Sequence, residues 1–147
     1  MISLLSLLTF IHLIGLILGA GAATVKLVLL FKCKSDPDLV PSYLKIFKPI
    51  TRLIITGLIL LTISGIGWLL YGYPFSSELI IKLVLVLAIW IVGPVIDNVF
   101  EPKFIKLAPT VDQEVSVEFM QIQNKYLSME IFATLLFYVI IVMWVLI

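Results

Sequence analysis

Charged residues are scarce in this sequence. Only 13% of its 147 residues are charged and 62% are hydrophobic, whereas soluble domains typically carry about 25% charged residues. So little polar surface cannot cover a water-soluble globule, and the composition therefore predicts an integral membrane protein with the lipid bilayer as its main partner. The net charge is only +1, which provides no positive field to attract nucleic acid and excludes that class of partner.

Cysteine and histidine each occur only once. The single Cys33 excludes an internal disulfide and any cysteine-based metal cluster. The sequence also has no nucleophile–base motif, phosphate-binding loop or metal-spaced carboxylate cluster, and this absence argues against hydrolase and kinase functions. The chemical interest therefore falls on the single His12 and on the few ionisable residues within apolar stretches.

Four apolar stretches are long enough to cross a membrane. A hydrocarbon core of about 30 Å requires roughly 20 helical residues. The first stretch has no basic segment before it and exceeds the apolar core of a signal peptide, so it is expected to span the membrane. We expect an all-α fold in which residues 1–147 form one domain, an antiparallel four-helix bundle with spans at about 3–31, 51–73, 79–99 and 129–147.

Local signals predict how these helices begin and end. Pro49 lacks a backbone donor and marks a start or a kink of the second helix. Aromatic residues from Trp68 to Phe75 are typical of a membrane interface, and Gly72 favours a turn there. Thr110-x-x-Gln113 has the pattern of a capping box. The fourth helix is therefore expected to begin at about residue 112 and to extend on the cytoplasmic side.

Basic residues predict the orientation. The segment between the second and third spans contains none, whereas the other two connections and their margins contain eight: Lys32, Lys34, Lys45, Lys48, Arg52, Lys103, Lys106 and Lys125. By the positive-inside rule, these two connections face the cytoplasm and both termini face outward. We therefore expect a multi-pass protein of the cytoplasmic (inner) membrane.

Small residues indicate the helix contacts. In the first helix Gly15 and Gly19 form a GxxxG pattern on the same face as His12. Such a pattern allows close approach of a neighbouring backbone or of a flat ligand. Gly15 and Gly19 are therefore candidate cofactor-binding positions as well as candidate helix contacts.

Ionisable residues within apolar helices are expensive and are functional candidates by default. Lys26, Arg52, Asp97 and Glu130 lie near the predicted cytoplasmic interface, where long side chains can reach the headgroups. We expect them to form structural ion pairs, Lys26 with Asp97 and Arg52 with Glu130. Lys82 lies about one turn from the outer interface and has either a snorkelling or a functional role.

His12 lies about nine residues inside the outer end of the first helix, on the order of 13 Å along its axis. One interpretation is a neutral imidazole that is hydrogen-bonded to Thr, Ser or a carbonyl. The other is an axial ligand to haem iron, with a copper ligand or a proton carrier as further options. A single histidine cannot provide bis-histidine ligation within one chain, so haem would be five-coordinate, bound by a second ligand such as Lys or Met, or shared across a dimer.

The order of these features resembles the superfamily that contains HemJ-type protoporphyrinogen oxidases and the membrane part of CopD-type copper proteins. The resemblance is carried by four segments, and His12 and Lys82 are its specific residues. The segments are Phe10-Ile-His12-Leu-Ile-Gly15, Pro49-Ile-Thr-Arg-Leu, Gly65-Ile-Gly-Trp68-Leu-Leu and Leu79-Ile-Ile-Lys82-Leu-Val-Leu-Val.

The resemblance implies b-type haem at His12 and a role in activity for Lys82. The chain departs from the HemJ pattern at Ile17 and Leu18, where that pattern has a tryptophan, and at Asp97, near which it has a further histidine. These departures favour membership of the superfamily without protoporphyrinogen oxidase activity. The Met- and His-rich ligand sets of a copper carrier are absent as well.

Two other classes of function remain open at this stage. The chain can be a non-enzymatic membrane subunit, either a homo-oligomer or a small partner in a larger complex. It can also be a small transporter or channel, but broken helices at the midplane would then be expected, and only Pro94 hints at one.

Overall fold

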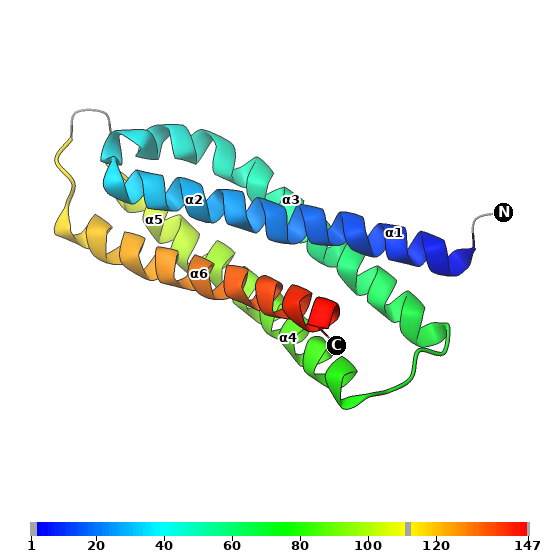
Figure 1. Ribbon diagram of the computed structural model, residues 1–147. Coiled ribbons are helices and arrows are strands. Elements are labelled where there is room, and N and C mark those ends of the chain that lie inside the picture. The colour runs from blue at the N-terminus through cyan, green and yellow to red at the C-terminus, as the bar shows by residue number, and fades with distance from the viewer. Residues whose placement is uncertain (1–2, 111–112, 147) are drawn as a thin grey trace.

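The computed structural model describes residues 3–110 and 113–146, and the described residues form helices and turns without strands. Nine helical elements of the described residues follow one another as four helical rods joined by short connections (Figure 1). The rods consist of α1 (Leu4–Leu16), η1 (Ile17–Gly21) and α2 (Ala22–Ser35); η2 (Pro37–Leu39) and α3 (Val40–Leu70); α4 (Ser77–Val95), η3 (Ile96–Phe100) and α5 (Glu101–Leu107); and α6 (Val117–Leu146).

Each rod is long and apolar enough to cross a membrane. The candidate spans are Leu4–Ser35, Pro37–Leu70, Ser77–Leu107 and Val117–Trp144. The expectation of an all-α chain with four apolar helices is therefore confirmed. The outward-facing side chains of these helices are largely leucine, isoleucine, valine and phenylalanine, as expected where lipid replaces water.

Short polar side chains cap the helices. Ser3 Oγ accepts a hydrogen bond from the Ser6 amide at 3.1 Å, and Ser76 Oγ accepts one from the Leu79 amide at 3.3 Å. Ser116 Oγ does the same for the Phe119 amide at 3.1 Å before α6. These bonds satisfy amide groups that have no partner within the helix. Gly72 has φ of 93° after α3, a conformation that favours glycine.

Two helix starts differ from the sequence expectation. α3 begins at Val40 and runs through Pro49, because Val40, Tyr43 and Phe47 form a buried stripe that holds the additional turns. Residue 112, the expected start of the fourth helix, lies outside the described residues, and α6 begins at Val117. The Gln113 side chain does accept from the Thr110 amide at 3.2 Å, but this bond stabilises a turn ahead of the helix.

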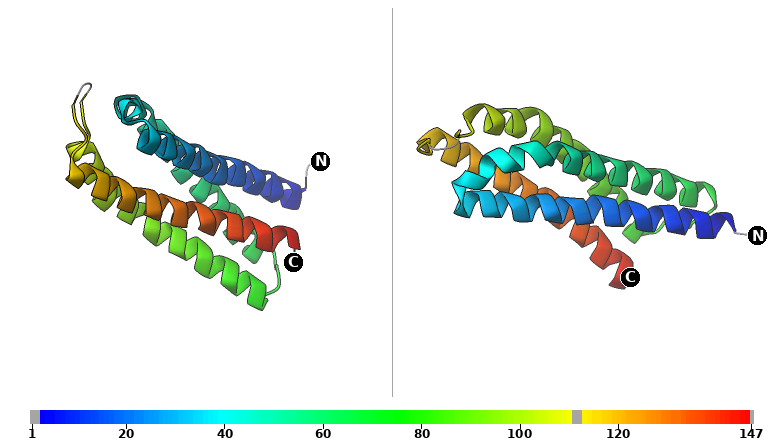
Figure 2. Two further views of the ribbon diagram at one scale, coloured as in Figure 1. Left: turned by 60° about the vertical axis from the view of Figure 1, so that its left-hand side comes forward. Right: turned by 90° about the horizontal axis from the view of Figure 1, so that it is seen from above.

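The four rods form two pairs that are joined at one end. α1 packs on α3 and α4 packs on α6, while α2 contacts both α3 and α6. The pairs are therefore tied together where α2, α5 and α6 meet, whereas α1 has little contact with α4 or α6 toward the end that carries the first turns of α1 and the last turns of α6. We call these the joined end and the open end. Figure 2 shows the two pairs from two further sides.

The core has two parts that follow this division. The joined end contains a large cluster around Tyr43, Phe104, Phe119 and Tyr126, with aromatic rings 5.1–6.0 Å apart. A smaller aliphatic cluster with Phe137 lies midway along the bundle. The joined end is thus packed like the interior of a soluble domain, and the open end has less core to hold it.

Glycines bring the first two rods together. A Cβ atom added to Gly57 of α3 would collide with the backbone of Gly19, and one added to Gly15 would lie 2.9 Å from the Leu61 backbone nitrogen. The GxxxG pattern of the first rod is therefore used for a close helix contact inside the chain.

Candidate functional site

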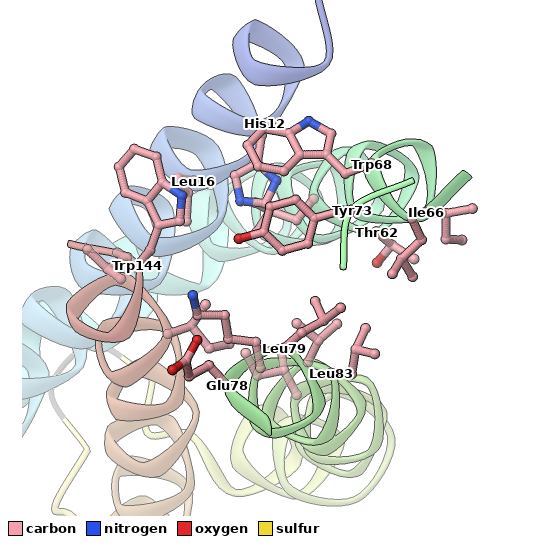
Figure 3. Close-up of a pocket in the computed structure, with 18 of the residues that line it drawn as sticks. His12, Leu16, Thr62, Ile66, Trp68, Tyr73, Glu78, Leu79, Leu83 and Trp144 are labelled. Carbon is pink, nitrogen blue, oxygen red and sulfur yellow. The ribbon is translucent and has the colours of Figure 1, made fainter. Parts of the chain in front are cut away.

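A pocket of about 180 Å³ lies at the open end between the two helix pairs. All four rods contribute to its walls, and Figure 3 shows side chains of α3 on one side and of α4 on the other. The walls are mostly aliphatic, and the polar groups among them are few: His12, Thr62, Ser76, Glu78 and Lys82, together with the polar tips of Trp68, Tyr73 and Trp144. An apolar cavity with a small number of polar groups is the usual form of a ligand site.

His12 enters this pocket from α1 and is anchored by α3. Its Nδ1 lies 2.9 Å from Ser64 Oγ, and Ser64 Oγ in turn donates to the Leu60 and Leu61 carbonyls at 2.8 and 3.0 Å. The only hydroxyl hydrogen of Ser64 is used in that way, so Nδ1–H of His12 is the donor to Ser64. The neutral imidazole then carries its lone pair on Nε2, for which the described residues provide no hydrogen-bond partner.

Aromatic side chains surround the imidazole. The ring of Trp68 is stacked at a centroid distance of 6.1 Å from His12, and Tyr73 follows Trp68 at 5.7 Å. Figure 3 shows Trp68 and Tyr73 beside His12, and Trp144 from α6 nearby. Trp68 and Tyr73 were expected in an interface belt, and the structure places both in the pocket lining. The stacking of Trp68 and the bond to Ser64 together orient the ring of His12.

Lys82 lines the same pocket from α4 and is half-buried. Glu78, one turn earlier on the same helix, also lines the pocket but is exposed. The structure therefore brings His12 and Lys82, the two specific residues of the sequence resemblance, to one cavity. It adds a carboxylate near the mouth that the sequence interpretation did not assign to the site.

Gly15 and Gly19 lie outside the pocket lining. Both are buried, Gly15 against Leu61 and Gly57, and Gly19 against the ring of Phe137 and Gly57. Their spacing suggested either a close helix contact or a cofactor-binding position, and the structure shows the helix contact. They hold α1 against α3, and this packing places His12 one turn before Gly15 at the pocket wall.

The four residues expected to form ion pairs lie toward the joined end, with different partners from those predicted. Lys26 Nζ is 2.7 Å from Glu130 Oε1 and 3.5 Å from Glu101 Oε2. The predicted pairs of Lys26 with Asp97 and of Arg52 with Glu130 are not among the ion pairs of the described residues. Arg52 is exposed, and Asp97 lies one turn before Glu101. The π-helical turn η3 widens the helix between them and leaves Glu101 against Lys26.

Several functional residues have signals that sequence reasoning did not use. Ser64 is a small polar residue in an apolar helix, a typical bonding partner for a buried imidazole. Glu101 lies between Pro94 and Pro102, which each remove a backbone donor from the helix, and π-helical turns are frequent at functional sites. Its pairing with Lys26 depends on that turn, which no local pattern predicts.

The pocket suits a cofactor whose metal ion is already coordinated by atoms of the cofactor itself. Within the described residues no three His, Cys, Asp or Glu side chains converge to hold a metal ion, whereas haem iron requires only one or two protein ligands. Nε2 of His12 has no hydrogen-bond partner among the described residues and is available as one such ligand. The cavity is smaller than the ~300–1,000 Å³ typical of ligand pockets, so a macrocycle fits only if the two helix pairs move apart at the open end.

Comparisons with protein-family models, curated proteins and solved structures give no significant match to this chain.

Proposed function

We propose that this chain is a multi-pass protein of the cytoplasmic membrane that binds b-type haem at the open end, with His12 as an axial ligand. The proposal follows the resemblance to the HemJ- and CopD-containing superfamily. The observation that carries it is the bond from His12 Nδ1 to Ser64 Oγ at 2.9 Å. A metal-binding histidine commonly donates its second ring nitrogen in this manner, which fixes its tautomer and orientation.

The orientation in the membrane is part of this proposal. The first turn of α1, the last turns of α6 and the α3–α4 connection lie at one end of the bundle (Figure 1). That connection contains no basic residue, whereas the opposite connections are rich in lysine. By the positive-inside rule the open end faces outward, and the joined end faces the cytoplasm.

Each residue of the pocket has a separate role in the proposed binding of haem. His12 ligates, Trp68 and Tyr73 provide flat apolar surface, and Lys82 contacts a propionate or an anionic substrate. The bound haem would supply one-electron chemistry, while the protein sets its orientation and its access to water. The carboxylate of Glu78 at the mouth repels an anionic group on its side of the pocket. An anionic ligand therefore enters with its charged edge toward Lys82.

Opening the pocket affects the smaller core cluster and leaves the larger one in place. At this level α3 and α4 are linked by a hydrogen bond from Trp90 Nε1 to Thr62 Oγ1 at 3.0 Å, which contributes about 1 kcal/mol. They are also linked through the smaller aliphatic cluster, whose Leu58, Leu61, Ile89 and Phe137 line the pocket. The aromatic cluster that holds the helix pairs together lies at the other end. Separation of the pairs at the open end therefore leaves the main core intact.

The test is the visible absorption spectrum of protein purified in mild detergent from haem-replete cells, before and after dithionite. The proposal predicts a Soret band with sharpened reduced peaks, its loss in His12→Ala, and its retention in Thr9→Ala, which changes the same helix one turn away. A colourless folded protein, or a His12→Ala variant that keeps the band, contradicts the assignment.

A non-enzymatic membrane subunit or homo-oligomer is the second candidate. The observation that favours it is open space beside Gly21 and Gly93, where an added Cβ would meet no atom within 4 Å, so that a neighbouring helix can approach closely. Native mass analysis in lipid nanodiscs tests it: a stable dimer or larger assembly, weakened by Gly93→Leu, supports it, and a monomer at all concentrations contradicts it.

A further inference from the structure

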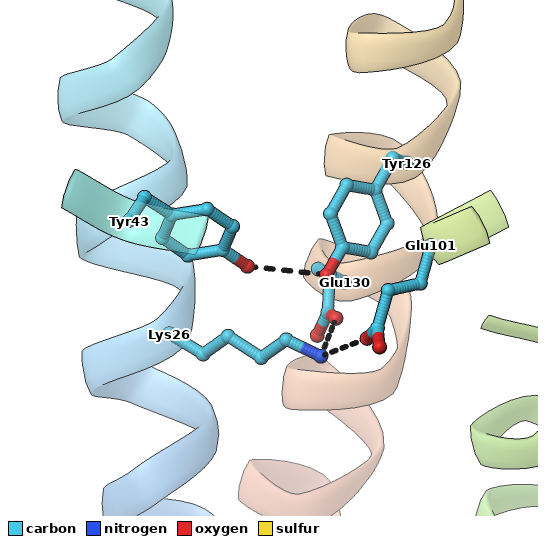
Figure 4. Close-up of polar contacts among 5 residues, drawn as sticks. All are labelled: Lys26, Tyr43, Glu101, Tyr126 and Glu130. Carbon is cyan, nitrogen blue, oxygen red and sulfur yellow. Dashed lines mark hydrogen bonds and ion pairs between the residues drawn. The ribbon is translucent and has the colours of Figure 1, made fainter. Parts of the chain in front are cut away.

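A second polar site lies toward the joined end, among α2, α5 and α6. Lys26 of α2 extends between α5 and α6, and its Nζ contacts Glu101 at 3.5 Å and Glu130 at 2.7 Å (Figure 4). The exposed fractions of the three side chains are 2%, 12% and 4%. We call these three residues the buried triad. It is well removed from His12, which is four turns earlier on the same rod.

The charges of the buried triad do not balance. One ammonium group faces two carboxylates, and Asp97 of η3 acts on both of them from one side. The remaining ionisable groups that face the triad are phenols: Tyr43 from α3 and Tyr126 from α6, whose hydroxyls are 3.1 Å apart. Lys26 is the cation that acts on both glutamates, so ionisation of all the carboxyl groups would leave a net negative charge in a buried site.

An unbalanced buried charge costs several kcal/mol, and there are two ways to remove it. One is to bind a metal cation. The place of that cation is already taken by the ammonium group of Lys26, and no three acidic, His or Cys side chains of the described chain converge in a metal-binding arrangement. The other is to bind a proton on a carboxylate. A proton needs no coordination shell and only one acceptor oxygen.

The hydrogen bonding around the triad also leaves room for that proton. Glu101 Oε2 is buried, and its contact with Lys26 is the longer of the two. On the face of α6 that carries Glu130, Thr134 Oγ1 and Gln123 Nε2 are buried without a hydrogen-bond partner, and both residues are at most 5% exposed. Buried polar atoms without partners are rare in folded proteins, so this region has hydrogen-bonding capacity that contacts among the described side chains do not use.

We propose that the buried triad is a proton-binding site, which holds one proton on the Glu101–Glu130 carboxyl pair at neutral pH. The proton comes from water on the cytoplasmic side, forms an O–H bond to a carboxylate oxygen, and returns to water when that bond breaks. Glu101, the most exposed of the three side chains, is the point of exchange. The ligand of this site is thus a proton, and the inference is independent of whether haem binds at His12.

Infrared difference spectroscopy of the full chain in lipid tests this proposal, because a protonated carboxyl group has its own C=O stretching band. At neutral pH the wild type should show this band, and alkaline pH should remove it. Either Glu101→Gln or Glu130→Gln should abolish the band, because the one glutamate that remains is then balanced by Lys26, whereas Asp97 is partly exposed and can be hydrated. The control Glu118→Gln, at an exposed position at the start of α6, should leave it unchanged.

Three results would overturn the proposal: no protonated carboxyl band in the folded wild type at neutral pH, a band that persists in both glutamine variants, or a band that disappears when sodium or calcium chloride is added at constant pH. The last result would assign the site to a metal cation. Circular dichroism of each variant separates these outcomes from unfolding, since two different single substitutions must both remove the band while the helices persist.

Discussion

The two ends of this bundle use the same four rods in opposite ways. At the joined end, α2, α3, α5 and α6 meet around aromatic rings, and the buried lysine has two carboxylates within 3.5 Å. At the open end the rods separate into two pairs, and His12 and Lys82 line a cavity in which neither forms an ion pair with a carboxylate of the described residues.

This difference teaches where each kind of polar group can lie. A charge that is fully enclosed must be compensated by the protein, and Lys26 therefore lies where packing is densest. A group that is to meet a ligand must keep a free atom, and His12 does so because Ser64 uses only one of its two nitrogens. We therefore expect substitutions at the joined end to change mainly the free energy of unfolding, and substitutions at the open end to change mainly ligand binding.

Removal of the buried cation should have the largest effect on stability. Lys26→Met leaves Glu101 and Glu130 without their counter-ion, and loss of one partner of a buried ion pair costs about 3–5 kcal/mol. Because the carboxylates can take up protons instead, the loss should be smaller in acid than at neutral pH. The measurement is the unfolding free energy in detergent against pH. Lys32→Met, at an exposed position of the same helix, is the matched control and should change it little.

A methyl group at the closest helix contact should have the next largest effect. Gly57→Ala places a Cβ against the backbone of Gly19 and Gly15, and overpacking of this kind costs about 1–3 kcal/mol. Gly65→Ala lies two turns later on the same helix, where an added Cβ meets no atom within 4 Å. That variant should be neutral or slightly stabilising, and equal losses in both variants would contradict the packing of α1 on α3.

The hydroxyl pair of the joined end should contribute a smaller amount. Tyr43→Phe removes the bond to Tyr126 but keeps the ring among its aromatic neighbours. The expected loss in unfolding free energy is about 1 kcal/mol. Because this change lies far from the pocket, the absorption spectrum of any bound haem should stay as in the wild type, and an altered spectrum would show that the two ends are coupled.

A substitution at the open end should have the smallest effect on stability and the largest effect on ligand binding. Ser64→Ala removes the acceptor of His12 Nδ1 and should cost about 1 kcal/mol or less, because the half-exposed imidazole can bond water instead. Haem affinity should fall about 10- to 100-fold, as is typical when a partner of a metal-binding histidine is lost. Titration of haem into the purified variant measures this, with Ser77→Ala, an exposed position beyond the pocket, as control.

The sequence predicted the features that depend on composition and on single residues. Four apolar helices and a close helix contact at Gly15 and Gly19 could be predicted, because apolar runs and small-residue spacing are local signals. Lys26 and Glu130 were expected near a membrane interface, and the structure buries both. A hydrogen bond from His12 to a serine or threonine was one of the two interpretations, and Ser64 is the residue that makes it.

The pairing of residues on different helices could not be predicted in the same way. Lys26 pairs with Glu101 instead of Asp97 because η3 is a π-helical turn, and the angular position of every later residue of that rod depends on it. The extension of α3 before Pro49 did have a local signal, the stripe of Val40, Tyr43 and Phe47. A proline at an exposed position of a helix can be tolerated when the turn before it is held by packing.

The most direct test of the account is the binding of haem to protein produced in haem-deficient cells. Haem is added stepwise to the wild type, His12→Ala and Glu101→Gln, and the Soret band is followed. The account predicts saturable binding by the wild type and by Glu101→Gln, with no defined Soret band in folded His12→Ala. Equal binding by all three proteins would contradict the assignment of the open end as the ligand site. Loss of binding in Glu101→Gln but not in His12→Ala would contradict it as well.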